Sequence, residues 1–230
     1  MKVSAKLTKF VCLDRGKDHS CLFVPGWATD YRIFSNLDLD FNYIYPEEFD
    51  PFSFKEDLLD YLKEKEIRKI SLLGYSLGGF LAAEFACKNP GMIDQLILVS
   101  IRSSYKKSEI AQVKEYLTKS KRGFLLKFYQ DCFVNRDDSK WFRENLLKEY
   151  CDKFSSEELL RGLDYLTQAK IDTEALKKIN RLKIIHGESD KIAPAEEVYH
   201  LTEDLLKAEV VFMKDTGHML FLKDEFKELI

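Results

Sequence analysis

A single serine stands at the apex of a glycine-rich turn. The turn, Gly74-Tyr75-Ser76-Leu77-Gly78-Gly79, follows the apolar residues 70–73 and precedes the helix-like residues 80–86. Gly-x-Ser-x-Gly between a strand and a helix is typical of a nucleophile elbow, in which a sharp turn presents the hydroxyl to a general base. Gly74 and Gly78 leave room where a Cβ would collide with neighbouring elements. Alone, the pattern also fits an ordinary strand-to-helix loop with a serine N-cap.

Two later segments contain an acid and a base that could serve this serine. Asp190 closes the segment His186-Gly187-Glu188-Ser189-Asp190, and His218 lies in Thr216-Gly217-His218-Met219. Each follows an apolar run of strand length. The chain order Ser76, Asp190, His218 is the order nucleophile, acid, base that accompanies such an elbow. We therefore predict that His218 accepts the serine proton and that Asp190 orients its ring.

The alternatives to this assignment fit less well. His186 precedes the acid and is expected to be structural, whereas Glu188 is a rival to Asp190, which could also be a plain turn residue. Residues 100–104 follow another predicted strand where the acid could stand, and they contain no carboxylate. This favours Asp190. The two remaining histidines lie in a polar turn and in a predicted helix: His19 and His200.

A tetrahedral intermediate also needs two backbone N–H donors for its oxyanion. One is expected from Leu77, directly after the nucleophile. The other is expected from Trp27, in the segment Pro25-Gly26-Trp27 that follows the apolar residues 21–24. Proline lacks an N–H, but the donor stands two positions later, so both donors remain.

Strand-length apolar runs alternate with helix-like segments, which predicts an α/β fold with a mostly parallel central sheet flanked by helices. Strands are expected within residues 3–13 and at 21–24, 41–45 (ended by Pro46), 70–73, 95–99, 182–185 and 210–213, with helices at 54–65 and 195–207. Residues 103–175 show helical segments only, at 108–120, 123–133, 140–154 and 157–165. We therefore assign residues 1–102 and 176–230 to the core and 103–175 to a helical cap over the ligand-binding edge of the sheet.

Composition excludes several other classes of protein. The chain has 230 residues, 45% hydrophobic and 33% charged, with a formal net charge of −3, which gives no reason to expect nucleic acid binding. No apolar run reaches the length of a membrane span, and residues 1–6 lack the apolar core of a signal peptide. Five scattered cysteines without a Cys-x-x-Cys pair indicate a reducing cytoplasm. Without a metal-ligand cluster or a phosphate loop, no cofactor is expected.

These motifs resemble the α/β-hydrolase superfamily, and most closely the pimeloyl-[acyl-carrier protein] methyl ester esterases of biotin synthesis. The cap segment at residues 159–166 and the residues around Phe128 add to the likeness. The resemblance implies hydrolysis of a methyl ester on a pimeloyl chain carried by an acyl carrier protein. It also implies that substrate contacts Trp27, Leu77, Phe128, Tyr129 and Gln130.

Basic residues gather in the first part of the cap although the chain is slightly acidic. We expect four of them to dock the acidic carrier protein: Lys119, Lys121, Arg122 and Lys127. The alternative is a solvated helix face without a partner.

Three functions therefore follow from the sequence. The first is a serine esterase acting on the carrier-linked methyl ester. The second is a general carboxylesterase for small esters, or a carbon–carbon hydrolase or lyase, which would use the same motifs. The third is a ligand-sensing protein of the same fold without catalysis, against which the complete set of Ser76, Asp190 and His218 argues.

Overall fold

A seven-stranded sheet forms the centre of the computed structural model, which describes residues 7–230. The strand order is β1-β3-β2-β4-β5-β6-β7, and only the β1–β3 pair is antiparallel. The α/β-hydrolase fold predicted from the sequence is confirmed. The strands are β1 (Lys9–Leu13), β2 (Ser20–Val24), β3 (Asn42–Glu48), β4 (Ile70–Tyr75), β5 (Ile93–Val99), β6 (Leu182–Gly187) and β7 (Glu209–Met213). Residues 3–6 of the expected first strand lie outside the described residues.

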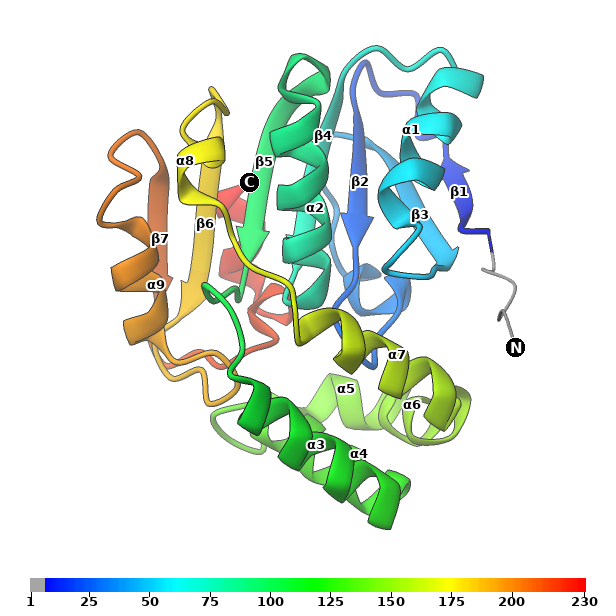
Figure 1. The fold of residues 1–230 in the computed structure, drawn as a ribbon, viewed down its shortest axis with the longest axis vertical. Coiled ribbons are helices and arrows are strands. Elements are labelled where there is room, and N and C mark those ends of the chain that lie inside the picture. Colours follow the sequence, from blue (N-terminus) through cyan, green and yellow to red (C-terminus); the bar gives the residue numbers. More distant parts are fainter. Residues whose placement is uncertain (1–6) are drawn as a thin grey trace.

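The central strands are apolar throughout because both faces of the sheet are covered. Strand β4 is buried at every position, and residues 21–24 of β2 are fully buried beside it. Helices α1 (Phe54–Glu64), α2 (Leu77–Lys88), α8 (Thr173–Leu176) and α9 (Ala195–Thr202) lie on one face, and the C-terminal turns η3 (Leu220–Leu222) and η4 (Asp224–Leu229) lie behind the sheet (Figure 1). The parallel strands all end at the same edge, which places the loops that follow them together.

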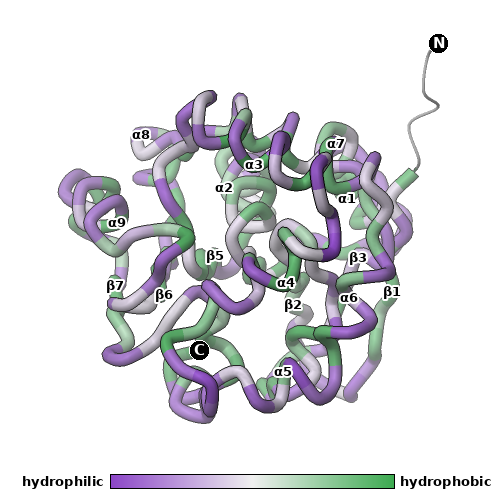
Figure 2. Tube along the Cα trace, turned by 90° about the horizontal axis from the view of Figure 1, so that it is seen from below, coloured by the Kyte–Doolittle hydropathy of each residue, from purple (hydrophilic) through white to green (hydrophobic). Residues whose placement is uncertain are grey.

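Five helices cover that edge: α3 (Lys107–Lys119), α4 (Lys121–Asp131), α5 (Lys140–Asn145), α6 (Leu147–Lys153) and α7 (Ser156–Leu166) (Figure 1). Seen from below, α4 crosses the middle, with α3 and α7 on one side and α5 and α6 on the other (Figure 2). The two connections to the sheet meet at an isolated bridge between Ser104 and Lys170. The bridge joins the start and the end of the inserted helices beside β5.

Among the described residues, no helix is both long and apolar enough to cross a membrane.

Several element boundaries differ from the sequence prediction, and three of the differences have a visible cause. Strand β3 continues through Pro46, because β3 pairs with β2 only up to Ile44 and the β1–β3 register shifts beside the proline, so no ladder needs its missing N–H. The helix expected at 140–154 breaks at Leu146, which lets Phe142 and Tyr150 both pack on Tyr129. The helix expected at 195–207 ends at residue 202, where a threonine hydroxyl bonds back to a helix carbonyl.

The turn between β4 and α2 depends on two glycines that face other backbone. A Cβ on Gly78 would overlap the carbonyl oxygens of Val24 and Pro25, and a Cβ on Gly74 would lie 2.8 Å from the Cβ of Ala82. These clearances allow the end of β2, the elbow and the start of α2 to pack directly against one another.

We therefore expect Gly78→Ala to lower the free energy of unfolding by about 3 kcal/mol, because neither backbone carbonyl can move away without displacing β2. Chemical denaturation measures this. Gly91→Ala is the matched control, since a Cβ there meets nothing within 4 Å. Equal stability of the two variants would show that the elbow tolerates a side chain at residue 78.

Candidate active site

Ser76 lies between β4 and α2 with a strained backbone. Its φ is 52°, a left-handed conformation that L-residues rarely adopt, and its N–H donates to Val99 O on the adjacent strand at 2.9 Å. The strain is held by the strand on one side and by α2 on the other. As a result, the hydroxyl stands above the carboxyl edge of the sheet and under the cap, with the residue only 7% exposed.

Ser76, His218 and Asp190 form one hydrogen-bonded row. Ser76 Oγ lies 3.0 Å from His218 Nε2, and His218 Nδ1 lies 2.6 Å from Asp190 Oδ2. The His218 backbone is fixed at both sides, because its N–H donates to Cys132 O and its carbonyl accepts from Ser100 Oγ. With Nδ1–H donated to the carboxylate, Nε2 is free to accept the serine proton.

Asp190 is held as a carboxylate in a buried site. Its second oxygen, Oδ1, accepts the N–H groups of Ile192 and Ala193 at 2.8 and 2.9 Å. Burial raises the pKa of the Asp190 carboxyl, but the neighbouring His218 and His186 rings and the backbone N–H of Ala193 reverse this and bring the pKa below its usual value. The group therefore stays negatively charged at neutral pH and stabilises a protonated His218.

The rival residues lie where they cannot replace these three. His186 is fully buried with Nε2 2.8 Å from Ala193 O, and burial lowers the pKa of its imidazole, which keeps the ring neutral. Glu188 is exposed, and His200 is exposed on α9 beside Glu203. His186 thus braces the loop that holds Asp190.

The two expected oxyanion donors border the elbow. Leu77 is the first residue of α2, so its N–H has no partner within the helix. Within residues 7–230, neither this group nor the N–H of Trp27 donates to a protein acceptor. Gly26, just before Trp27, packs so closely that a Cβ there would lie 3.2 Å from Ser76 Cβ. The arrangement leaves two unused donors next to the serine.

Trp27 also joins this loop to the cap. Its indole Nε1–H donates to Leu159 O at 2.8 Å, and Phe128 meets its ring edge-on at 5.1 Å. Gly162 of α7 faces the indole, where a Cβ would lie 2.7 Å from a ring carbon. Trp27 and Leu77 together line a cavity of about 610 Å³ that opens between β3 and α7. Both residues that carry the expected donors therefore border this cavity.

The three cap residues predicted to contact substrate all belong to α4 but lie on different faces of it. Phe128 faces Trp27, whereas Tyr129 and Gln130 line a different cavity of about 870 Å³. The Tyr129 hydroxyl donates to Ala28 O, so it braces the oxyanion loop, and Gln130 is exposed. The structure thus brings Trp27, Leu77 and Phe128 together and places the other two elsewhere.

Asp30 is the centre of a second connection between this loop and the cap. The buried carboxylate accepts hydrogen bonds from Arg32, from Tyr150 at 2.6 Å and from Lys153. Burial raises the pKa of the Asp30 carboxyl, but these three partners outweigh it, so that the pKa lies below its usual value. The carboxylate fixes α6 to the loop that contains Trp27.

Each of the four predicted carrier-docking cations has a partner within the chain. Lys119 pairs with Glu115, Arg122 with Asp152, and Lys127 with Asp131, while Lys121 donates to Phe154 O. Their positive charge is therefore largely compensated at the surface. The docking role stays a prediction.

Tyr105 is a residue near the nucleophile that the sequence motifs did not indicate. Burial raises the pKa of its phenol to about 12, against smaller lowering effects of Arg102 and of a hydrogen bond with the Ser76 side chain. The Arg102 guanidinium stacks on the ring at 4.6 Å. The phenol stays protonated and can donate beside Ser76. One indication of this position was available from the sequence, because Tyr105 lies in the loop that follows β5, at the carboxyl edge of the sheet.

The described part of the chain contains no group of three or more His, Cys, Asp or Glu side chains placed to hold a metal ion.

A family profile described as alpha/beta hydrolase fold matches residues 25–225. The chain belongs to this family. The matched region begins at Pro25 and contains the elbow, the acid and the base, so the family and the geometry point to the same residues.

Several curated proteins resemble the chain. An uncharacterized hydrolase of Bacillus subtilis is 23% identical over 74% of this chain and 65% of its own length. A pimeloyl-[acyl-carrier protein] methyl ester esterase of Nitrosomonas europaea is 24% identical over 67% of this chain and 66% of its own. The matches to these two relatives thus span just under two thirds of their lengths. The human serine hydrolase BPHL is 24% identical over 92% of this chain and 78% of its own.

Solved structures share the fold along most of the chain. An esterase from Exiguobacterium antarcticum superposes with a TM-score of 0.84 at 18% identity, covering 96% of this chain and 94% of that one. A bromoperoxidase from Bacillus anthracis gives 0.81 at 20% identity, covering 96% and 92%.

We expect Asp190→Asn to slow labelling of Ser76 by a fluorophosphonate probe by about 10⁴-fold, because an amide cannot hold His218 in the required tautomer or stabilise its cation. The rate of labelling measures this without any assumption about substrate. Glu188→Gln removes an exposed carboxylate from the same loop and should leave the rate unchanged. If the Asp190→Asn protein is labelled as fast as the wild type, Asp190 is not the acid of the triad.

We expect Asp30→Asn to lower the free energy of unfolding at pH 7 by roughly 3 kcal/mol, because Lys153 and Arg32 lose a buried partner. Since the folded pKa of Asp30 lies below the unfolded value of about 3.9, the stabilisation is present above that value and is lost as the pH falls.

The difference between the wild type and Asp30→Asn should therefore shrink between about pH 5 and pH 2 in denaturation series. Asp38→Asn, which removes an exposed carboxylate, should show little difference at any pH. A difference for Asp30→Asn that does not change with pH would contradict an ionised Asp30 as its source.

Proposed function

We propose that this chain is a carboxylic-ester hydrolase. The observation that carries the proposal is the row from Ser76 Oγ to His218 Nε2 and from His218 Nδ1 to Asp190 Oδ2, at 3.0 and 2.6 Å. Such a row makes a serine hydroxyl nucleophilic at neutral pH. The two unused N–H groups beside it match the demand of a tetrahedral intermediate.

In the proposed first half-reaction, Ser76 Oγ attacks the ester carbonyl while His218 Nε2 takes the hydroxyl proton. The carbonyl oxygen becomes an oxyanion, which the N–H groups of Trp27 and Leu77 stabilise. Collapse of the intermediate breaks the bond to the alkoxy oxygen, and His218 donates its proton to the leaving alcohol. Ser76 is left acylated.

In the second half-reaction, water replaces the alcohol. His218 takes one water proton while the water oxygen attacks the acyl carbon, and the same two N–H groups stabilise the second oxyanion. The bond to Ser76 Oγ then breaks, His218 returns the proton to the serine, and the carboxylic acid leaves. Asp190 remains ionised throughout and stabilises each protonated state of His218.

Within this class, we propose the methyl ester of pimeloyl-[acyl-carrier protein] as the substrate. Support comes from the Nitrosomonas europaea relative and from the motif resemblance. The charges beside the donors do not add to this support. The cavity that Trp27 and Leu77 line has six carboxylate residues and two basic ones, and the predicted docking cations are paired.

That acidic cavity favours a second candidate, a carboxylesterase for small uncharged esters. Three of these carboxylates, those of Asp30, Asp50 and Glu47, pair with basic residues. Acidic residues still outnumber basic ones at this opening, which disfavours an anionic carrier relative to a free neutral ester. The esterase from Exiguobacterium antarcticum has the same fold, which is compatible with either candidate.

We expect Ser76→Ala to abolish hydrolysis of both pimeloyl-carrier methyl ester and a free methyl ester such as methyl butyrate, while both still bind. Loss of methanol release measures the first effect. Equal turnover by the alanine protein would refute the serine mechanism.

The two candidates separate in the wild-type protein. Strong preference for the carrier-linked ester, weakened by Lys119→Gln, Lys121→Gln and Arg122→Gln together, would support the carrier substrate and its predicted docking site. Equal use of the free ester, unaffected by these changes, would support the general esterase instead.

A further inference from the structure

The basic residues of the cap differ in whether a carboxylate pairs with them. Lys119 of α3 and Arg122 and Lys127 of α4 have carboxylate partners within the chain. Among the basic residues without an ion-pairing carboxylate in residues 7–230, three border one cavity: Arg136 and Arg143 of the cap, and Lys191 of the core. Uncompensated cations that converge on one space create a local positive potential there.

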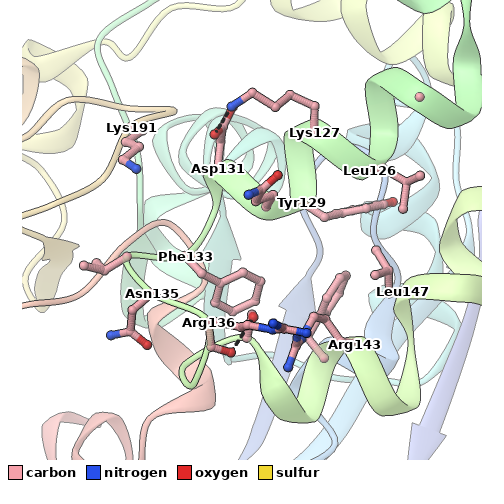
Figure 3. A pocket seen from close by; sticks show the side chains of 15 residues that line it. Leu126, Lys127, Tyr129, Asp131, Phe133, Asn135, Arg136, Arg143, Leu147 and Lys191 are labelled. Atoms are coloured by element: carbon pink, nitrogen blue, oxygen red, sulfur yellow. Dashed lines mark hydrogen bonds and ion pairs between the residues drawn. The ribbon is translucent and has the colours of Figure 1, made fainter.

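This cavity has a volume of about 870 Å³ and lies between α4, α5 and the chain that joins them (Figure 3). Four basic residues border it, against the single carboxylate of Asp131, which already pairs with Lys127. Its sign is therefore opposite to that of the cavity beside Trp27 and Leu77. The two cavities suit ligands of different charge.

Arg143 has a buried side-chain nitrogen without a hydrogen-bond partner among the described residues. Its Nε is buried and has no hydrogen-bond partner, although a buried guanidinium N–H is costly to leave unpaired. In Figure 3 the guanidinium groups of Arg136 and Arg143 project toward the same part of the cavity. Two positive charges that border the same cavity repel each other, and an anion bound in the cavity would reduce this repulsion. An oxyanion with two acceptor oxygens would satisfy both groups.

Much of the remaining wall is apolar, although Gln130, Asn135 and Ser139 also line the cavity. The large apolar side chains of this wall are those of Leu126, Tyr129, Phe133, Phe142 and Leu147. Leu126 is 41% exposed, which is unusual for a large hydrophobic residue of this chain. A ligand that matched both parts would carry an anionic group at one end and an apolar body at the other.

We propose that this cavity, called here the cap cavity, binds an amphipathic small molecule through its carboxylate or phosphate group, held by Arg136 and Arg143 with Lys191 at the rim. The apolar body of the ligand packs on Phe133, Phe142 and Leu126. Neither the triad nor the oxyanion donors line the cap cavity, so it is a site separate from the catalytic one.

The cap cavity nevertheless touches the loops that hold the catalytic residues. Cys132, next to Phe133, accepts the backbone N–H of His218, and Lys191 follows Asp190 in the chain. A Cβ on Gly217 would lie 2.6 Å from Cys132 O, which shows how closely these segments pack. A ligand in the cap cavity thus contacts the structure that positions the base.

The test uses octanoate and octyl phosphate as anionic probes and octanol as the neutral one, with binding followed by calorimetry on the full chain. At least one anion should bind, and octanol should bind more weakly by about ten-fold or more, because it cannot pair with the guanidinium groups. Added salt should weaken the binding of the two anions and leave the binding of octanol unchanged. If octyl phosphate binds more tightly than octanoate, the ligand carries a phosphate group. If octanoate binds more tightly, the ligand carries a carboxylate group.

Substitutions locate the binding. Arg143→Met and Arg136→Gln should each lower the affinity for the anion by about ten-fold. Arg143→Lys keeps the charge and protects folding, so it should lower the affinity by less. Arg122→Gln, which removes a paired cap arginine, should have no effect. Thermal denaturation establishes that each variant is folded.

The proposal is overturned if neither anion binds, if octanol binds equally well, or if the Arg136 and Arg143 variants bind as the wild type does. The last result would place the anion outside the cap cavity. Because no probe is a carboxylic ester, the outcome is independent of whether the chain hydrolyses esters.

Discussion

The close packing of the elbow against the end of β2 is the constraint on which the site depends. Gly78 lies against the carbonyls of Val24 and Pro25, so the left-handed Ser76 and the loop that begins at Pro25 are forced into contact. One steric requirement thus sets the position of the nucleophile and of both oxyanion donors. A hydroxyl presented by a freely moving loop would lose this alignment, and with it the advantage of preorganised donors.

The oxyanion loop is in turn fixed by the cap. Trp27, Ala28 and Asp30 bond to α7, α4 and α6 respectively, through an indole N–H, a carbonyl and a carboxylate. Three helices of the insertion therefore form hydrogen bonds with residues of the short segment 27–30. A shift of the cap would therefore displace Trp27, one of the two proposed oxyanion donors.

Charge is distributed in a way that composition does not reveal. The outer basic face of α3 and α4 is largely compensated by Glu115, Asp152 and Asp131. Three cations without an ion-pairing carboxylate in residues 7–230, Arg136, Arg143 and Lys191, border the cap cavity, and a cavity with more acidic than basic residues lies beside the donors. Ligands of the two cavities therefore meet different electrostatic potentials.

The sequence by itself determined the fold class and the identity of the candidate triad, because both rest on local patterns: apolar runs of strand length, a glycine-flanked serine, and an acid and a base at the ends of later strands. It missed the strand through Pro46, the break at Leu146 and the short α9, because neighbouring elements decide these boundaries.

Only the tertiary structure decided which charges are paired and which side of α4 each residue faces. Tyr129 looked like a substrate contact and instead bonds to Ala28, and Tyr105 became visible only beside Ser76. Pairing and facing depend on contacts between residues distant in the chain, which no local pattern records.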